Sequence, residues 1–195
     1  KLFENAFSII YNDIKSKSLA VIIGTFISSD QNSKQLTYGG RNNNLELLIP
    51  NGEPQECRLM NGNFVFVPKK IFRKVGFLNK VFTHNYGDID YGFRALKNNF
   101  KICIASEIVG ICDKNELEIW RKPNTKFISR LKSFYRSKNF ITNEVIYFQF
   151  VHYGFLRLIK HFAGVLLIIL FPKLYYKLSK LNRFFEIFNF VLNLI

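Results

Sequence analysis

A run of uncharged, mostly apolar residues at positions 19–27, LAVIIGTFI, constrains the fold of this chain more than any other segment. A continuous apolar run with β-branched residues is typical of a strand that is buried on both faces. A second strand-like segment, KICIA, lies at 101–105. Helices that cross between apolar strands favour a parallel or mixed sheet with helices on both faces, and ligands then bind beyond the carboxyl ends of the strands. The sequence therefore predicts an α/β fold.

The segments around these strands alternate between helical and extended patterns. Residues 2–14 place their apolar side chains on one face of a helix. A polar loop rich in Asn, Gln, Ser and Gly follows at 28–44, and residues 36–38 and 45–49 read as short strands of a hairpin-like excursion. A further helix is expected to begin near Asp88.

Two carboxylates, Asp88 and Asp90, stand at this expected helix start between two glycines. They are two residues apart, so they project in different directions on the first turn and suit different roles. Gly87 and Gly92 let the chain turn from a loop into a helix and let a ligand approach the backbone closely. From the residues alone, Asp88 is either a catalytic carboxylate or a helix N-cap.

The order of motifs around this pair resembles the C-terminal half of the catalytic domain of family 2 glycosyltransferases, which have the GT-A nucleotide-sugar fold. The motifs YGG, MNGN, THxxGDxDYG and VGxC occur in that order, at residues 38–40, 60–63, 83–92 and 109–112. A short apolar strand at 64–67, a helix at 68–75 and a Phe-Leu-Asn turn complete the pattern. The resemblance implies a GT-A mixed sheet flanked by helices, truncated at its N-terminus and followed by an α-helical tail.

The resemblance also implies an activity, the inverting transfer of a sugar from a nucleotide-sugar donor to a hydroxyl of a glycan or lipid-linked acceptor. Asp88 takes the position of the general base. Gly87 stands where the family usually has a Glu, so one carboxylate is missing from the acceptor side. The residues expected to bind the acceptor or the donor sugar are Asn61, Gly62, Asn63, His84, Asp90, Arg94 and Trp120.

Several of these residues have a structural reading as well. Asn61 and Asn63 are also ordinary turn residues, and a lone His such as His84 is often structural. Asp90 and Arg94 are four apart and can pair along one helix face, so that they act only by orienting the loop. Trp120 lies beyond the last strand, where its ring could stack on a sugar.

The metal motif of the family, a pair of Asp residues at a strand end, does not precede the helix at residues 2–14. We therefore expect the chain to be a fragment that is inactive alone, with the Mg²⁺ or Mn²⁺ of the full-length enzyme bound upstream of Lys1. Residues 1–122 are expected to form the C-terminal half of the catalytic domain, and residues 123–195 a basic, amphipathic helical tail.

Residues 121–195 carry thirteen Lys and Arg against two Glu, so this part holds +11 of the net charge of +14. No groove-reading or base-stacking motif accompanies the charge, which argues against nucleic acid as a partner. The basic residues alternate with apolar segments, which favours an anionic membrane surface. The uncharged segment 162–171 is too short to cross a bilayer as a helix.

The apolar residues from Leu174 to Ile195 recur at spacings of three and four, which predicts an amphipathic helix. Such a helix binds a membrane or packs on the catalytic domain or a partner subunit. The cysteines have no zinc-site spacing, and their odd number suits a reducing compartment. We expect a cytoplasmic protein, peripheral on the inner face of the cell membrane. The competing hypothesis is a non-catalytic, basic membrane-binding or scaffolding module that keeps the glycosyltransferase fold.

Overall fold

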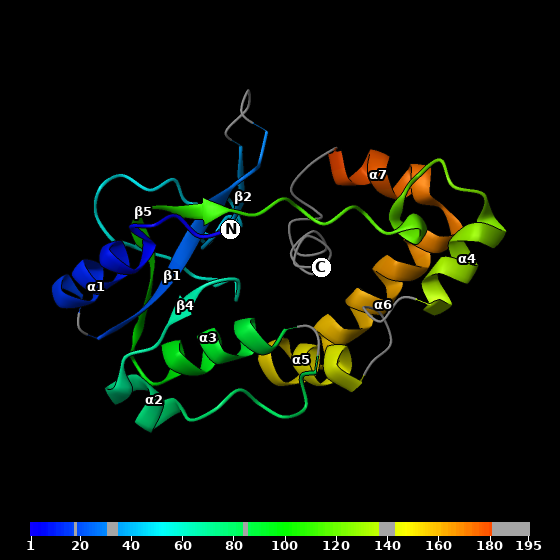
Figure 1. Cartoon of the computed structure of the whole chain (residues 1–195). Coiled ribbons are helices and arrows are strands. Elements are labelled where there is room, and N and C mark those ends of the chain that lie inside the picture. Colours follow the sequence, from blue (N-terminus) through cyan, green and yellow to red (C-terminus); the bar gives the residue numbers. More distant parts are fainter. Residues whose placement is uncertain (18, 31–34, 84–85, 137–142, 181–195) are drawn as a thin grey trace. The chain divides into compact units, whose positions relative to one another are not determined.

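Figure 1 shows the computed structural model of the chain. The structure describes residues 1–17, 19–30, 35–83, 86–136 and 143–180. The chain divides into two compact units, the first from Lys1–Asn79 and Gly87–Asn115 and the second from Lys80–Tyr86 and Glu116–Ile195. The boundary after Asn115 comes a few residues before the expected one at 122, and the segment that precedes the acidic motif joins the second unit.

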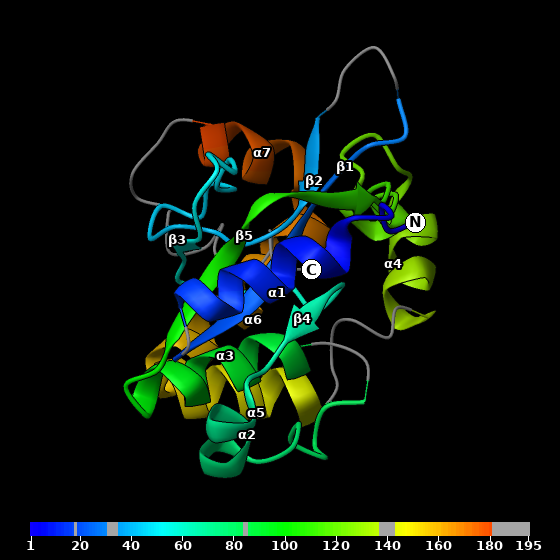
Figure 2. The same cartoon turned by 60° about the vertical axis from the view of Figure 1, so that its left-hand side comes forward.

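A mixed, open sheet forms the centre of the first unit (Figures 1 and 2). The strand β1, Ala20–Ile27, runs parallel to β5, Lys101–Ile111. On its other edge, β1 pairs antiparallel with two short strands, β2 at Leu36–Tyr38 and β4 at Val65–Phe66. The strand β3, Gln55–Glu56, pairs antiparallel with β5. The predicted α/β class and the mixed sheet flanked by helices are confirmed.

Helices cover both faces of this sheet (Figure 2). The helix α1, Ala6–Ser16, packs on one face, and α2, Lys69–Val75, and α3, Gly87–Lys97, pack on the other. Successive side chains of β1 alternate between the two cores, with Ile22 on the α1 side and Ile23 on the side of α2 and α3. Both are fully buried, which confirms the prediction of a strand buried on both faces.

The sequence placed some boundaries wrongly. The first helix begins at Ala6 and not at residue 2, because Leu2 forms a bridge to Gly110 and extends the chain alongside β5. Residues 45–49 form no strand, since Leu47 makes only an isolated bridge to Arg41. The two-residue strand β3 was not predicted, because so short a pairing leaves no periodic pattern.

The second unit is helical. After a short 3-10 helix at Ile119–Arg121 come α4, Phe127–Arg136, α5, Asn143–Tyr153, α6, Phe155–Leu170, and α7, Pro172–Lys180. One of its cores is built around Trp120, with side chains of α4, α6 and α7; its buried members are Trp120, Phe134, Val165, Ile168, Ile169 and Tyr175.

Described residues of the segment Lys80–Tyr86 pack on α5 within the second unit. The ring of Phe82 packs edge-on against those of Tyr147 and Phe148. The ring of Tyr86 stacks on that of Phe148 in α5, with a centroid distance of 4.5 Å. The backbone N–H and the hydroxyl of Thr83 both donate hydrogen bonds to the buried carboxylate of Glu144. A carboxylate that accepts two hydrogen bonds in this way holds Thr83 against α5.

The expected helical tail is present as far as the structure describes it. The uncharged segment 162–171 lies almost entirely within α6. In α7 the inward contact is made by Tyr175, while Leu174 of the expected apolar seam is 46% exposed. The seam beyond residue 180 lies outside the described residues. Within the described part of the chain, none of the helices has the length and hydropathy of a bilayer-spanning segment.

Candidate functional site

Asp88 lies in the first turn of α3 and joins two separate parts of the first unit. Its Oδ2 accepts a hydrogen bond of 2.6 Å from the backbone N–H of Gly62, and its Oδ1 accepts one of 2.8 Å from the N–H of Ile89. The second bond satisfies a first-turn N–H of the helix, as an N-terminal capping interaction does. The first bond connects the acidic motif to the loop at residues 61–63.

The environment of Asp88 favours a carboxylate that takes up a proton. Burial raises the pKa of Asp88 above its ordinary value, although the hydrogen bonds from Ile89 and Gly62 act in the opposite direction. Each carboxylate oxygen has two lone pairs, so the two backbone bonds leave acceptor capacity for a ligand hydroxyl. The side chain is half-buried. This combination of partial burial and remaining acceptor capacity is what a general base requires.

Gly62 packs so closely on Asp88 that a larger residue would displace one of them. A Cβ atom added to Gly62 would lie 3.0 Å from the Cβ of Asp88 and 3.1 Å from its Oδ2. The neighbouring residues shape the same loop, because the side-chain oxygen of Asn61 accepts a hydrogen bond of 3.1 Å from the N–H of Asn63. This is an Asx-type turn, as the structural reading of these two residues predicts.

The loop also reaches the end of β5. The side-chain amide of Asn63 donates to Sγ of Cys112 at 3.5 Å. Cys112 follows the last residue of β5, and its N–H donates to the carbonyl of Ile27 at the end of β1. The loop at residues 61–63 thus lies between the start of α3 and the carboxyl ends of the two parallel strands, which is where α/β sheets bind ligands.

Asp113 completes this edge, and the sequence analysis missed it. Its two carboxylate oxygens accept hydrogen bonds of 2.7 Å each from the backbone N–H and the hydroxyl of Ser29. These bonds lower the pKa of Asp113 below its ordinary value. The available signal was its position directly after the second apolar strand, which pointed to the ligand-binding edge of the sheet. Asp113 thus joins the segment that follows β5 to the segment that follows β1.

Asp90 and Arg94 form the predicted pair. Nε of Arg94 lies 2.8 Å from Oδ2 of Asp90, whose residue is 2% exposed. The other guanidinium nitrogens donate to the carbonyls of Val75, at 2.8 Å, and Phe77, at 2.9 Å. The pairing is confirmed, and the pair fixes the turn that follows α2, consistent with the structural reading. A direct contact of either residue with a sugar stays a prediction.

Two further predicted site residues are His84 and Trp120. His84 lies outside the described residues. Trp120 belongs to the second unit, where it is fully buried, its indole N–H bonds to Glu118, and its ring packs edge-on against Phe134 at 5.7 Å. A ring without an exposed face cannot stack on a sugar, so we leave Trp120 out of the site described here.

The described residues contain no group of three His, Cys, Asp or Glu side chains placed to hold a metal ion. Asp88 and Asp113 instead direct their carboxylates to backbone and hydroxyl donors.

Comparison with known sequences does not assign the chain to a family. The chain matches no protein-family model and no curated protein.

Proposed function

We propose that this chain is the acceptor-side part of a family 2 glycosyltransferase that moves a sugar from a nucleotide-sugar donor to a hydroxyl of a glycan or lipid-linked acceptor. The observation that carries the proposal is the hydrogen bond between Asp88 and Gly62. It joins the residue that matches the family's base to the loop that matches its donor-sugar loop. The two motifs are far apart in the sequence, so their contact supports a common role beyond the similarity of either motif alone.

In the proposed reaction, Asp88 accepts the proton of the acceptor hydroxyl while that oxygen attacks the anomeric carbon of the donor sugar. A bond forms between the acceptor oxygen and the anomeric carbon, and the bond from that carbon to the diphosphate oxygen breaks. The configuration at the anomeric carbon inverts, and the nucleoside diphosphate leaves with the bonding electrons. Gly62 lets the loop backbone approach the carboxylate of Asp88 closely, and Asn61 and Asn63 offer amide groups to the hydroxyls of the sugar.

The divalent cation expected for the full-length enzyme would stabilise the departing diphosphate.

The second unit supports a membrane location for the acceptor reaction. The helix α6 buries one face in its own unit and exposes apolar side chains on another, among them Leu156 at 74%, Leu166 at 58% and Leu170 at 51%. Exposed Lys173 and Lys177 follow in α7. Apolar side chains beside basic ones suit the interface of an anionic bilayer. We propose that the enzyme is peripheral on the cytoplasmic face of the membrane.

The proposal is tested by the release of nucleoside diphosphate from a panel of nucleotide sugars, using the full-length protein with a membrane extract as acceptor. Asp88→Asn keeps one side-chain oxygen, which can accept from one of the two backbone N–H groups, but the side chain cannot serve as the base. We expect acceptor-stimulated turnover to fall by about 10²- to 10⁴-fold, the usual contribution of a general base, while donor binding persists.

Glu107→Gln is the matched control, since it removes one carboxylate from an exposed position of β5 and should leave turnover unchanged. Activity that does not depend on Asp88 would contradict its assignment as the base. A full-length protein that folds but turns over none of the donors would instead favour the non-catalytic membrane-binding module.

A further inference from the structure

The helix α2 presents a dense basic surface on the first unit, away from the site at Asp88. Four of its seven residues are basic and exposed: Lys69, Lys70, Arg73 and Lys74. Their spacing places them on one side of the helix. On the other side, Ile71 is fully buried in the core under the sheet. The burial of Ile71 holds the helix so that its basic side faces solvent.

These four cations have no acidic partner in the part of the chain that the structure describes. The ion pairs found there join Asp90 to Arg94, Glu56 to Lys101, and Glu116 to Lys122. Like charges at neighbouring helix positions repel each other and destabilise the helix slightly. An external anion would relieve this repulsion.

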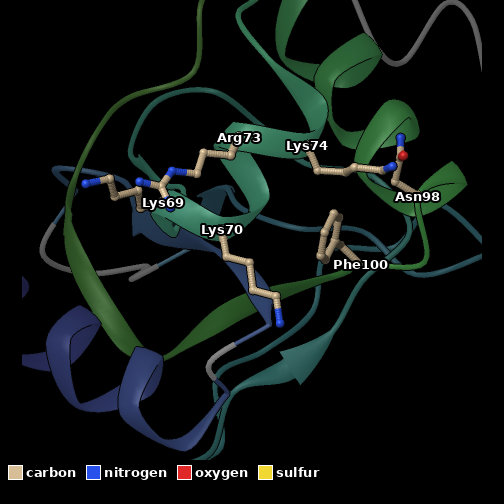
Figure 3. A pocket seen from close by; sticks show the side chains of 6 residues that line it. All are labelled: Lys69, Lys70, Arg73, Lys74, Asn98 and Phe100. Atoms are coloured by element: carbon tan, nitrogen blue, oxygen red, sulfur yellow. The ribbon is translucent and has the colours of Figure 1, made fainter.

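The basic residues line an open pocket of about 670 Å³ together with Asn98 and Phe100 (Figure 3). In Figure 3 the side chain of Lys74 extends toward Asn98, and that of Lys70 runs downward from α2, to the left of Phe100. The pocket therefore combines ammonium donors, one amide group and an aromatic wall. Phosphate oxygens suit the donors, and the aromatic wall suits the apolar part of a headgroup region.

An exposed apolar turn follows the basic helix. Gly76, with φ of 81°, ends α2 in a conformation that favours glycine, and the next two residues are Phe77, 80% exposed, and Leu78, 60% exposed. The turn is held in place, because the carbonyl of Phe77 accepts the hydrogen bond from Arg94 and its ring packs edge-on against Phe72 at 4.9 Å. Two large apolar side chains are thus fixed in water next to the four cations.

We propose that α2 and the turn at residues 76–78 form a contact surface for an anionic phospholipid bilayer. The lysines and Arg73 bind headgroup phosphates, one of them in the pocket, while Phe77 and Leu78 enter the interfacial region. This surface belongs to the first unit, whereas the apolar face of α6 belongs to the second, and the proposed binding does not depend on sugar transfer.

Co-sedimentation of the whole chain with vesicles tests the charges. The vesicles contain either phosphatidylcholine alone or equal parts of phosphatidylcholine and phosphatidylglycerol. Each basic residue near an anionic surface contributes about fivefold to binding, or about 1 kcal/mol, so Lys70→Gln with Lys74→Gln should weaken partitioning onto the anionic vesicles by about 30-fold. The matched control, Lys15→Gln with Lys17→Gln, removes two exposed charges from the opposite side of the sheet, at α1, and should change binding by less than about threefold.

Two results would overturn the proposal. One is a loss of binding in Lys173→Gln with Lys177→Gln, but none in the α2 variant, which would assign the membrane contact to the second unit alone. The other is tight binding of inorganic phosphate or pyrophosphate that does not release the protein from the vesicles. This result would identify the pocket as a site for a free phosphate compound.

A fluorescent reporter tests insertion without removing any basic residue. The chain has one tryptophan, Trp120, which is fully buried and gives a constant background. In Leu78→Trp, the added indole should shift its emission to the blue on anionic vesicles and be quenched by brominated lipid chains. Glu107→Trp on β5 is the matched reporter and should remain unquenched. Unshifted and unquenched emission from the Leu78→Trp variant bound to vesicles would show that the turn does not enter the bilayer.

Discussion

Arg94 provides a direct test of what holds the acidic motif and the turn after α2 together. Its guanidinium group donates to Asp90, Val75 and Phe77 at 2.8 to 2.9 Å. Arg94→Met keeps most of the length of the side chain but removes all three donors and the positive charge. Asp90, with only 2% of its surface exposed, would then remain as a buried charge without its ion-pair partner.

Removing one partner of a buried ion pair usually costs about 3 to 5 kcal/mol. The Arg94 side chain is 26% exposed, so water can approach the site, and we expect the lower end, about 3 kcal/mol. Arg94→Lys keeps the charge but cannot reproduce the planar fork toward the two carbonyls, so it should cost about 1 to 2 kcal/mol. Asp90→Asn should be less harmful in the Arg94→Met background than in the unchanged chain, with a coupling of about 1 to 3 kcal/mol.

Hydrogen exchange of the β1 amides reports the stability of the first unit by itself, which is necessary because a chain with two units need not unfold in one step. The double-mutant cycle is measured on the unchanged chain, the two single variants and the double variant. A loss below about 1 kcal/mol for Arg94→Met, or additive effects of the two substitutions, would refute the reasoning.

Three further predictions concern the loop, a buried histidine and the thiols. Gly62→Ala should weaken the bond to Asp88 and raise the pKa of that carboxyl further, as NMR titration of the side-chain carbonyl carbon would detect. Burial lowers the pKa of His161 from 6.5 to about 4, and the nearby charge of Arg157 acts in the same direction. The free energy of unfolding of the second unit should therefore fall by up to about 3 kcal/mol as the pH falls from 6.5 to about 4. Urea titrations should show that the stability of His161→Phe depends less on pH. An aromatic disulfide reagent should modify the half-exposed Cys112 first at neutral pH, because burial raises the pKa of Cys57 and raises that of Cys103 to about 11; equal rates for all three thiols would contradict this.

The strongest periodic signals predicted their elements well. The apolar run at 19–27 became β1, and the helix expected near Asp88 became α3. These predictions worked because one physical requirement, the burial of an apolar face, determines both the pattern and the element. The pairing of Asp90 with Arg94 was also predictable, since a spacing of four on a helix fixes the distance.

Contacts between distant segments could not be predicted in the same way. Asp88 and Gly62 are 26 positions apart, and only the packing of α3 under the sheet brings them together. Asp113 meets Ser29 because β1 and β5 are parallel and end at the same edge. Trp120 shows the opposite problem, because its position beyond the last strand suggested a ring that could stack on a sugar, whereas residues far along the chain in α4 and α6 bury it completely.

The pairing of β1 with β5 also has a consequence for how the chain folds. The register joins Ala20 to Lys101 and Ile27 to Ile111, so the two central strands are separated by most of the first unit. Such non-local pairing slows folding, because the intervening loop must close before the contacts form. During synthesis, β1 leaves the ribosome as an apolar segment and cannot pair with β5 until all of β5 has been synthesised. The segments made in between, which supply β2 and β4, can pair with one edge of β1 in this interval and protect it from association with other chains.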